Sequence, residues 1–91
     1  MEHKRTLTIQ NDLGLHGRAA AKIVELSRLY KSKLFFKKNG NGEVDGSNIL
    51  SILTLSGSKG TELEVKAVGE DAKELLEKLN ILFDDKFGEG R

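Results

Sequence analysis

The chain has 91 residues, of which 15 are basic, 14 are acidic and none is cysteine or proline. This length suits one small domain, so we expect a single domain over residues 1–91. The missing cysteines exclude disulfide frameworks, thiolate zinc sites and thiol catalysis. The near balance of charge gives no electrostatic reason to expect a nucleic-acid partner.

No apolar run is long enough to cross a bilayer, and no basic segment followed by an apolar stretch resembles a secretory signal. We therefore expect a cytoplasmic protein that does not insert into a membrane.

The first half of the chain predicts a strand, a helix and a hairpin. Apolar and polar residues alternate from His3 to Gln10, the period of two that is typical of a half-buried strand. From Gly17 to about Tyr30 the apolar residues recur at the spacing of an amphipathic helix. Two short strands follow, Lys33 to Lys38 and Glu43 to Asp45, joined by the strong turn signal Asn-Gly-Asn-Gly at residues 39–42.

A short helix is predicted next, from Ile49 to Leu55, with Asn48 or Ser47 as its N-cap. On this helix we expect Leu50 to point outward, and three residues to face the core, namely Ile49, Ile52 and Leu53.

The remaining elements are a strand and a long helix. Residues Thr61 to Ala67 alternate cleanly, and after Gly69 apolar residues spaced by three and four continue to Phe83. The glycines at 88 and 90 indicate a tail that is frayed from about residue 88. The order β-α-β-β-α-β-α predicts an α+β domain in which helices cover one face of a single sheet and the other face meets solvent.

The chemistry is concentrated between Leu13 and Ala21. His16 stands directly before the first predicted helix, and Arg18 follows two residues later. Free backbone N–H groups and the helix dipole, which contributes about 0.3–1 kcal/mol, make such a position an anion site. An imidazole titrates near pH ~6.5, so much of it is an uncharged nucleophile at neutral pH. The segment predicts a histidine that meets a phosphate.

Simpler interpretations exist for each of these residues. A lone histidine in a small domain is more often a surface or capping residue, and Arg18 alone is more often a solvated helix residue. His3 lies near the terminus and is expected to be solvated, and two histidines so far apart make no convincing metal site. We expect no metal and no cofactor.

The segment GLHGRAA at residues 14–20 resembles the HPr family, the histidine-containing phosphocarrier proteins of the bacterial phosphotransferase system. It matches the family signature GLHARPA at five of seven positions, and the resemblance runs from Thr6 to about Phe87. It implies an open-faced β-sandwich with a four-stranded antiparallel sheet and three helices on one side. Two positions depart from the signature. Gly17 stands where the family commonly has Ala or Thr, and Ala19 stands where the family has Pro. Both departures reduce rigidity at the helix start.

The resemblance also implies a function and partners. His16 would take a phosphoryl group on Nδ1, from phosphoenolpyruvate through Enzyme I, and pass it to sugar-specific A components. Arg18 would pair with phosphate oxygens, and the backbone N–H groups of Gly17 and Arg18 would complete the phosphate site. The protein would be a monomeric carrier that acts as substrate and donor for partner enzymes rather than as an enzyme itself.

The surface around His16 is expected to contact both partners, with Leu50 as the apolar anchor and Arg28 as a rim charge. The other expected docking residues are Ala20, Ala21, Val24, Ile49 and Leu53. The regulatory serine of many family members falls on Asn48, if one extra residue is allowed in the 39–42 turn. Ser47 is adjacent, and we expect no kinase regulation.

Two alternatives remain open at this point. One is an HPr-like regulatory module that signals by its phosphorylation state with little or no sugar transport. The other is an unrelated α/β module that binds RNA on its sheet. The aromatic residues available for stacking are few and at least partly committed to the core, namely Tyr30, Phe35 and Phe36.

Overall fold

Four strands form one antiparallel sheet in the computed structural model, which describes residues 1–91. The strands lie side by side in the order β1-β4-β2-β3. Their bounds are Glu2–Thr8 for β1, Lys33–Lys38 for β2, Val44–Asp45 for β3 and Glu62–Val68 for β4. Only β2 and β3, which form a hairpin, are neighbours both in the sheet and along the chain. β4 lies between β1 and β2.

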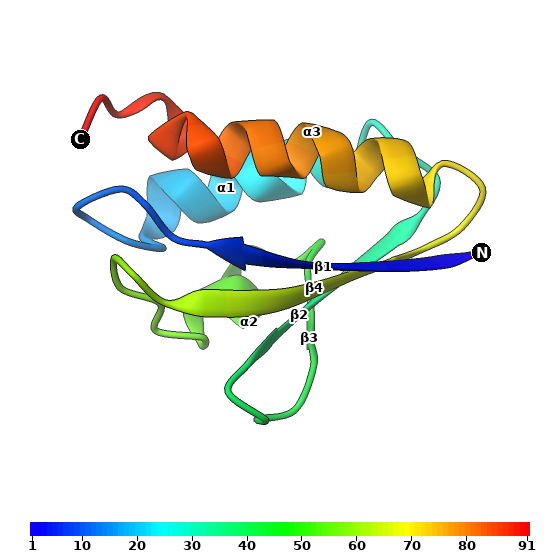
Figure 1. Ribbon diagram of the computed structural model, residues 1–91, viewed down its shortest axis with the longest axis horizontal. Helices are drawn as coiled ribbons and strands as arrows, with labels where there is room; N and C mark the ends of the chain where they lie inside the picture. The colour runs from blue at the N-terminus through cyan, green and yellow to red at the C-terminus, as the bar shows by residue number, and fades with distance from the viewer.

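Three α-helices pack on one face of this sheet. They are α1 (Gly17–Ser27), α2 (Ile49–Leu53) and α3 (Ala72–Asp84), and a single 3₁₀ turn, η1 (Lys86–Gly88), follows α3. Figure 1 shows α1 and α3 running together over the sheet, with the C-terminus at the end of the molecule opposite the N-terminus. The predicted fold class, an α+β open-faced sandwich, is confirmed. None of the helices combines the length and apolar character needed to span a bilayer.

The core lies between the sheet and the helices because the strands alternate in the predicted way. On β4, Leu63, Val65 and Ala67 are all buried, whereas Glu62 and Glu64, which alternate with them, face solvent. Phe36 of β2 is fully buried in the same core. Full burial of one such apolar side chain stabilises the fold by about 1.5–3 kcal/mol.

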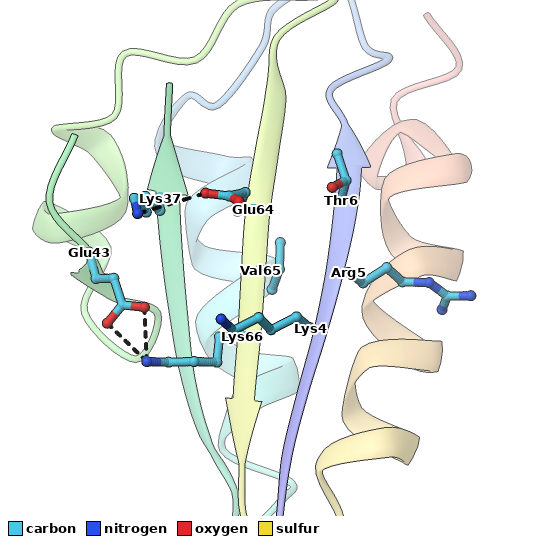
Figure 2. A pocket seen from close by; sticks show the side chains of 8 residues that line it. All are labelled: Lys4, Arg5, Thr6, Lys37, Glu43, Glu64, Val65 and Lys66. Carbon is cyan, nitrogen blue, oxygen red and sulfur yellow. Dashed lines mark hydrogen bonds and ion pairs between the residues drawn. The ribbon is translucent and has the colours of Figure 1, made fainter. Parts of the chain in front are cut away.

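The other face of the sheet is open and carries charges of both signs (Figure 2). Lys66 reaches Glu43 at 2.9 Å and lies 5.1 Å from the centre of the Phe35 ring. Phe35 is therefore a residue of the open face, and the expectation that it belongs partly to the core is wrong. A single half-buried ring beneath a lysine that is already paired does not form a platform on which bases could stack.

The first helix ends earlier than predicted. It stops at Ser27 instead of Tyr30, and isolated turn bonds continue from there. The chain then changes direction because Asp71 accepts hydrogen bonds from the backbone N–H groups of Lys31 and Ser32, both at 2.9 Å. These contacts fix the start of β2 against the start of α3, a constraint that helical periodicity does not contain.

Two further predictions fail at the short helix and the tail. On α2, Leu50 points outward with 74% exposure as predicted and Ile52 is buried, but Ile49 is 39% exposed and does not belong to the core. The tail is not frayed from residue 88, because Phe87 is fully buried and Glu89 packs against the loop before α1. That contact places the end of the chain beside His16.

Candidate functional site

His16 is the N-cap of α1, where the extended chain turns into the helix. Its backbone is extended, with φ −96° and ψ −179°, and its carbonyl accepts the N–H of Ala20 at 2.9 Å. Its ring nitrogen Nδ1 accepts the backbone N–H of Arg18 at 3.2 Å. A ring nitrogen that accepts a hydrogen bond carries a lone pair and not a proton. The nucleophilic lone pair of the imidazole therefore faces the N-terminus of the helix.

The loop that carries His16 rests on a second glycine loop. Gly14 has φ +69°, and a Cβ on it would lie 2.4 Å from the carbonyl oxygen of Gly57. The N–H of Leu15 donates to that same oxygen at 2.9 Å. Only glycine accommodates both the left-handed backbone and the close approach. These contacts hold the chain in place immediately before His16.

The second ring nitrogen of His16 faces the end of the chain. Nε2 contacts the Oε2 carboxylate oxygen of Glu89, and the other oxygen, Oε1, accepts a hydrogen bond from Nδ2 of Asn11 at 2.9 Å. Asn11 is fully buried and also donates to the carbonyl of Gly14 at 2.8 Å. Asn11 thereby links the glycine loop, the histidine and the tail.

The charge of Glu89 is stabilised by its neighbours. Burial by itself would raise the pKa of this carboxyl, but hydrogen bonds from Asn11 and His16 and the charges of His16 and Arg18 outweigh it. The net effect is a pKa below the ordinary value. Glu89 is therefore a carboxylate at neutral pH, directly beside the imidazole.

Arg18 is exposed, and its side chain takes part in none of the ion pairs of the structure. The backbone N–H of Arg18 is occupied by Nδ1 of His16, so a group bound to Nδ1 would lie next to it. A Cβ on Gly17 would meet no atom of another part of the chain within 4 Å, so the space beside the first turn is open at this position. No surface hollow is lined by His16. Its side chain, 28% exposed, is thus presented on a surface.

The expected docking residues divide into two groups. Leu50, Ile49 and Arg28 are exposed, and Ala21 and Leu53 are half-buried. Ala20 and Val24 are buried to 0% and 2% exposure, respectively, so their assignment to a docking surface is wrong. Both side chains are on the stripe of α1 that packs into the core, and a partner cannot reach them.

The cap of α2 is Asn48, whose Oδ1 accepts the N–H of Ser51 at 3.2 Å. Ser47 is exposed, and its hydroxyl donates to the carboxylate of Asp45 at 2.7 Å. The two residues weighed for the N-cap thus have separate roles, with Asn48 stabilising the helix and Ser47 closing the turn before it.

Sequence reasoning missed Asn11, Gly57 and Glu89 as parts of this site. Their contacts join segments far apart in the chain, and the three residues follow no periodic pattern. The apolar residue Phe87 is the one signal that could have located the tail, because it lies four residues after the buried Phe83.

Comparison with known proteins identifies the class of protein that this fold and site define. The family model described as "PTS HPr component phosphorylation site" matches residues 3–85. The phosphocarrier protein HPr of Pseudomonas aeruginosa is 39% identical over 84 residues, which cover 92% of this chain and 93% of that protein. The phosphocarrier protein NPr of Escherichia coli K12 is 32% identical over 89 residues, covering 98% of this chain and 99% of NPr.

The fold comparison agrees. The crystal structure of HPr from Thermoanaerobacter tengcongensis has a TM-score of 0.89 and 33% identity, and the match covers 96% of this chain and 97% of that one. The class is that of phosphocarrier proteins of the phosphotransferase system. The chain belongs to the HPr family, whose members carry phosphoryl groups between components of that system and are not catalysts in themselves.

Proposed function

We propose that His16 accepts a phosphoryl group on Nδ1 from phosphorylated Enzyme I and passes it to an A component of the phosphotransferase system. The observation that carries this proposal is the orientation of the imidazole. Nδ1 faces the backbone N–H of Arg18 at 3.2 Å, at the positive end of α1. A phosphoryl group on that nitrogen would be bound by N–H groups and by the helix dipole together.

The transfer needs little from the carrier beyond positioning and charge neutralisation. The transition state of phosphoryl transfer is loose, with its charge spread over three oxygens. Arg18 supplies a planar guanidinium that pairs with two of these oxygens at once, which lysine does less well. Because the Arg18 side chain is exposed, it can follow the phosphoryl group from one partner to the next.

The position of His16 on the surface, outside any pocket, fits a carrier better than an enzyme. A carrier has to insert its phosphoryl group into the active sites of at least two partners, so its reactive atom must lie on a convex surface. Leu50, 74% exposed on α2, is the proposed apolar anchor for docking, together with the exposed Ile49 and the half-buried Ala21. We further propose that the carrier is a cytoplasmic monomer, which sedimentation would test.

The deciding experiment is incubation with phosphoenolpyruvate and an active Enzyme I from the same source, followed by phosphorus NMR and mass analysis at neutral and acid pH. An acid-labile phosphate on His16 is expected. His16→Ala should abolish the label and keep the fold, and Arg18→Ala should slow the labelling. His3→Ala is the matched control, because His3 lies on β1, where it pairs with Ala67 of β4, and not at the start of α1. A label that survives His16→Ala would refute the proposal.

The second candidate function is a regulatory module with little sugar transport. It is favoured because this chain is similar to phosphocarriers of two different names, with 39% identity to HPr and 32% identity to NPr. The two candidates share the site and differ in the acceptor. Supplying phosphorylated protein with sugar-specific and nitrogen-branch A components in parallel would distinguish them, because only the true acceptor should remove the phosphate rapidly.

A further inference from the structure

A hollow opens at the edge of the sheet because the edge strand β3 is short. β3 pairs with only two residues of β2, Phe35 and Phe36, and the N–H of Gly46 then donates to the carbonyl of Leu34 at 2.7 Å. Beyond that bond, the start of β2 has no strand beside it on this side. A hollow of about 340 Å³ remains there, between the start of β2, the end of α1 and the turn before α2. This volume lies at the lower end of the range of small-molecule sites, about 300–1,000 Å³.

The apolar part of the wall comes from Tyr30, Leu34 and Phe35. Leu34 is buried to 2% exposure, whereas the two aromatic residues are half-buried. Aromatic side chains that remain partly exposed gain free energy when a ligand covers them. The wall therefore offers apolar surface to the body of a ligand.

Two cations without ion-pair partners line the same hollow. Arg28 and Lys33 are both exposed, and neither takes part in any ion pair of the structure. The one carboxylate in the wall, Asp45, already accepts the backbone N–H and the hydroxyl of Ser47 on one oxygen, at 2.8 and 2.7 Å. These hydrogen bonds hold the pKa of Asp45 below its ordinary value, and the charge of Lys33 adds to the effect. With two cations and one carboxylate in its wall, the hollow is positively charged at neutral pH.

The end of α1 also faces this hollow, and the negative end of a helix dipole opposes an anion. Its effect is reduced here, because the carbonyls of Val24, Leu26 and Ser27 accept N–H groups of the following turn at 3.1–3.2 Å. The cationic residue Arg28 also stands at the C-cap itself. The end of the helix is thus already partly neutralised.

The lysine-rich hollow on the open face of the sheet differs in this respect (Figure 2). Its three lysines, Lys4, Lys37 and Lys66, each lie within 4.0 Å of a glutamate. Its fourth cation, Arg5, points away from these lysines toward α3 (Figure 2). The positive charge of that face is therefore either neutralised or directed elsewhere, whereas Arg28 and Lys33 remain available.

From this arrangement we propose that the hollow between α1, β2 and the turn before α2 binds a small phosphate monoester with an apolar body. The phosphate pairs with Arg28 and Lys33, and the body packs on the apolar wall. The two cations match the charge of such a phosphate, about −1.5 to −2 at pH 7. The guanidinium of Arg28 suits two phosphate oxygens at once, and the ammonium of Lys33 acts as a point charge. Binding is reversible and involves no covalent step, so the proposal does not depend on the role of His16.

The test is a titration of the nitrogen-15-labelled full-length protein with phenyl phosphate at constant ionic strength, followed by the backbone amide signals. Saturable shifts are expected at Lys33, Phe35 and Ser47, which line the hollow. Inorganic phosphate lacks the apolar body, and benzoate carries only one charge, so both should bind at least about fivefold more weakly. Equal affinity for either probe would overturn the proposed ligand class, and shifts that do not saturate would overturn the site.

Three variants test the cations. Arg28→Gln and Lys33→Gln should each weaken the binding of phenyl phosphate at least about fivefold, because each removes a charge-assisted contact. Lys31→Gln is the matched control, since Lys31 is an exposed cation two residues before Lys33 that does not line the hollow. Its affinity should equal that of the wild type. Unchanged affinity in both Arg28→Gln and Lys33→Gln would refute the proposal.

The phosphate could instead occupy the start of α1, and the same spectra separate the two sites. Shifts confined to the amides of Gly17 and Arg18 would assign the probe to the surroundings of His16 and overturn the proposal. The titration is therefore repeated with His16→Ala, in which the shifts at Lys33 and Ser47 should persist with the same affinity. This result holds whether or not His16 carries phosphate, so a failure of the proposed function and a failure of this proposal are distinguishable.

Discussion

Two glycines on either side of His16 should respond in opposite ways to the same substitution. Gly14 has φ +69°, and a methyl group on it would lie 2.4 Å from the carbonyl oxygen of Gly57 and 3.0 Å from the Cα of Ser58. Both neighbours are backbone atoms, which cannot rotate away as the end of a side chain can. Gly14→Ala therefore has to displace one of the two loops.

The cost follows from two contributions. The left-handed conformation costs about 1–2 kcal/mol for a residue with a Cβ. Displacement of the loops also lengthens the hydrogen bond from Leu15 to Gly57, now 2.9 Å, and such a bond contributes about 0.5–1.5 kcal/mol. Gly14→Ala should therefore lower the free energy of unfolding by about 1.5–3.5 kcal/mol. In a domain of this size that corresponds to a decrease of roughly 6–28 °C in Tm.

Gly17→Ala is the matched control. Its Cβ would meet no atom within 4 Å, and its φ is not in the left-handed region, so the substitution should stabilise the protein by about 0.4–1 kcal/mol through the unfolded state. Urea unfolding followed by circular dichroism gives both values. An unchanged midpoint for Gly14→Ala, with an unchanged slope, would show that the two loops are not packed as described.

Three other substitutions test separate parts of the molecule. Leu50→Ala should change stability by less than ~0.5 kcal/mol and weaken binding to Enzyme I at least about fivefold by calorimetry, whereas the equally exposed Leu29→Ala should leave binding unchanged. Phe87→Ala should lower the free energy of unfolding by about 3–5 kcal/mol, because Phe87 is fully buried. It should also release the tail, which hydrogen exchange would detect as faster exchange of the Glu89 amide. Slow exchange of that amide would contradict the anchoring role of the Phe87 ring. Hydrogen bonds from Ser32 and Lys31 hold the pKa of Asp71 below its ordinary value of 3.8. The stability that Asp71 provides is therefore present above that pH, and it is lost as the pH falls through the lowered pKa. Asp71→Ala should therefore have a lower Tm than the wild type at neutral pH, and the difference should shrink in acid; a constant difference would argue against these bonds.

The regular elements could be predicted because their signals are local. Alternation from Thr61 to Ala67 specified both the strand β4 and the face that it buries, and the structure shifts its bounds by one residue. The Asn-Gly turn at 39–42 likewise specified the hairpin. Such patterns predict strands and helices because side chains return to the same face of each element with a fixed period, independently of the rest of the chain.

The docking surface was predicted less well because two requirements were placed on one face of α1. Val24 and Ala20 were assigned both to the apolar stripe that faces the core and to the partner surface. One side chain cannot satisfy both, and burial to 2% or less decides for the core. On α2 the predicted outward position of Leu50 is confirmed, since the short helix has an exposed face that carries this large apolar side chain, and its role in docking stays a prediction.

The tail shows why a site can extend beyond what local patterns reveal. Gly88 and Gly90 indicated fraying, and each has φ +77°, but in the structure they turn the chain back instead of freeing it. What decides the outcome is Phe87, whose burial orders the residues around it and brings Glu89 to His16, 73 residues earlier in the chain. The spacing of four from Phe83 to Phe87 is enough to predict that burial, but not the direction in which the chain leaves it. That direction depends on two left-handed residues that are not glycine, and these are stable only because the tail is docked. Undocking of the tail would therefore release this backbone strain and remove the Glu89 carboxylate from Nε2 of His16 at the same time.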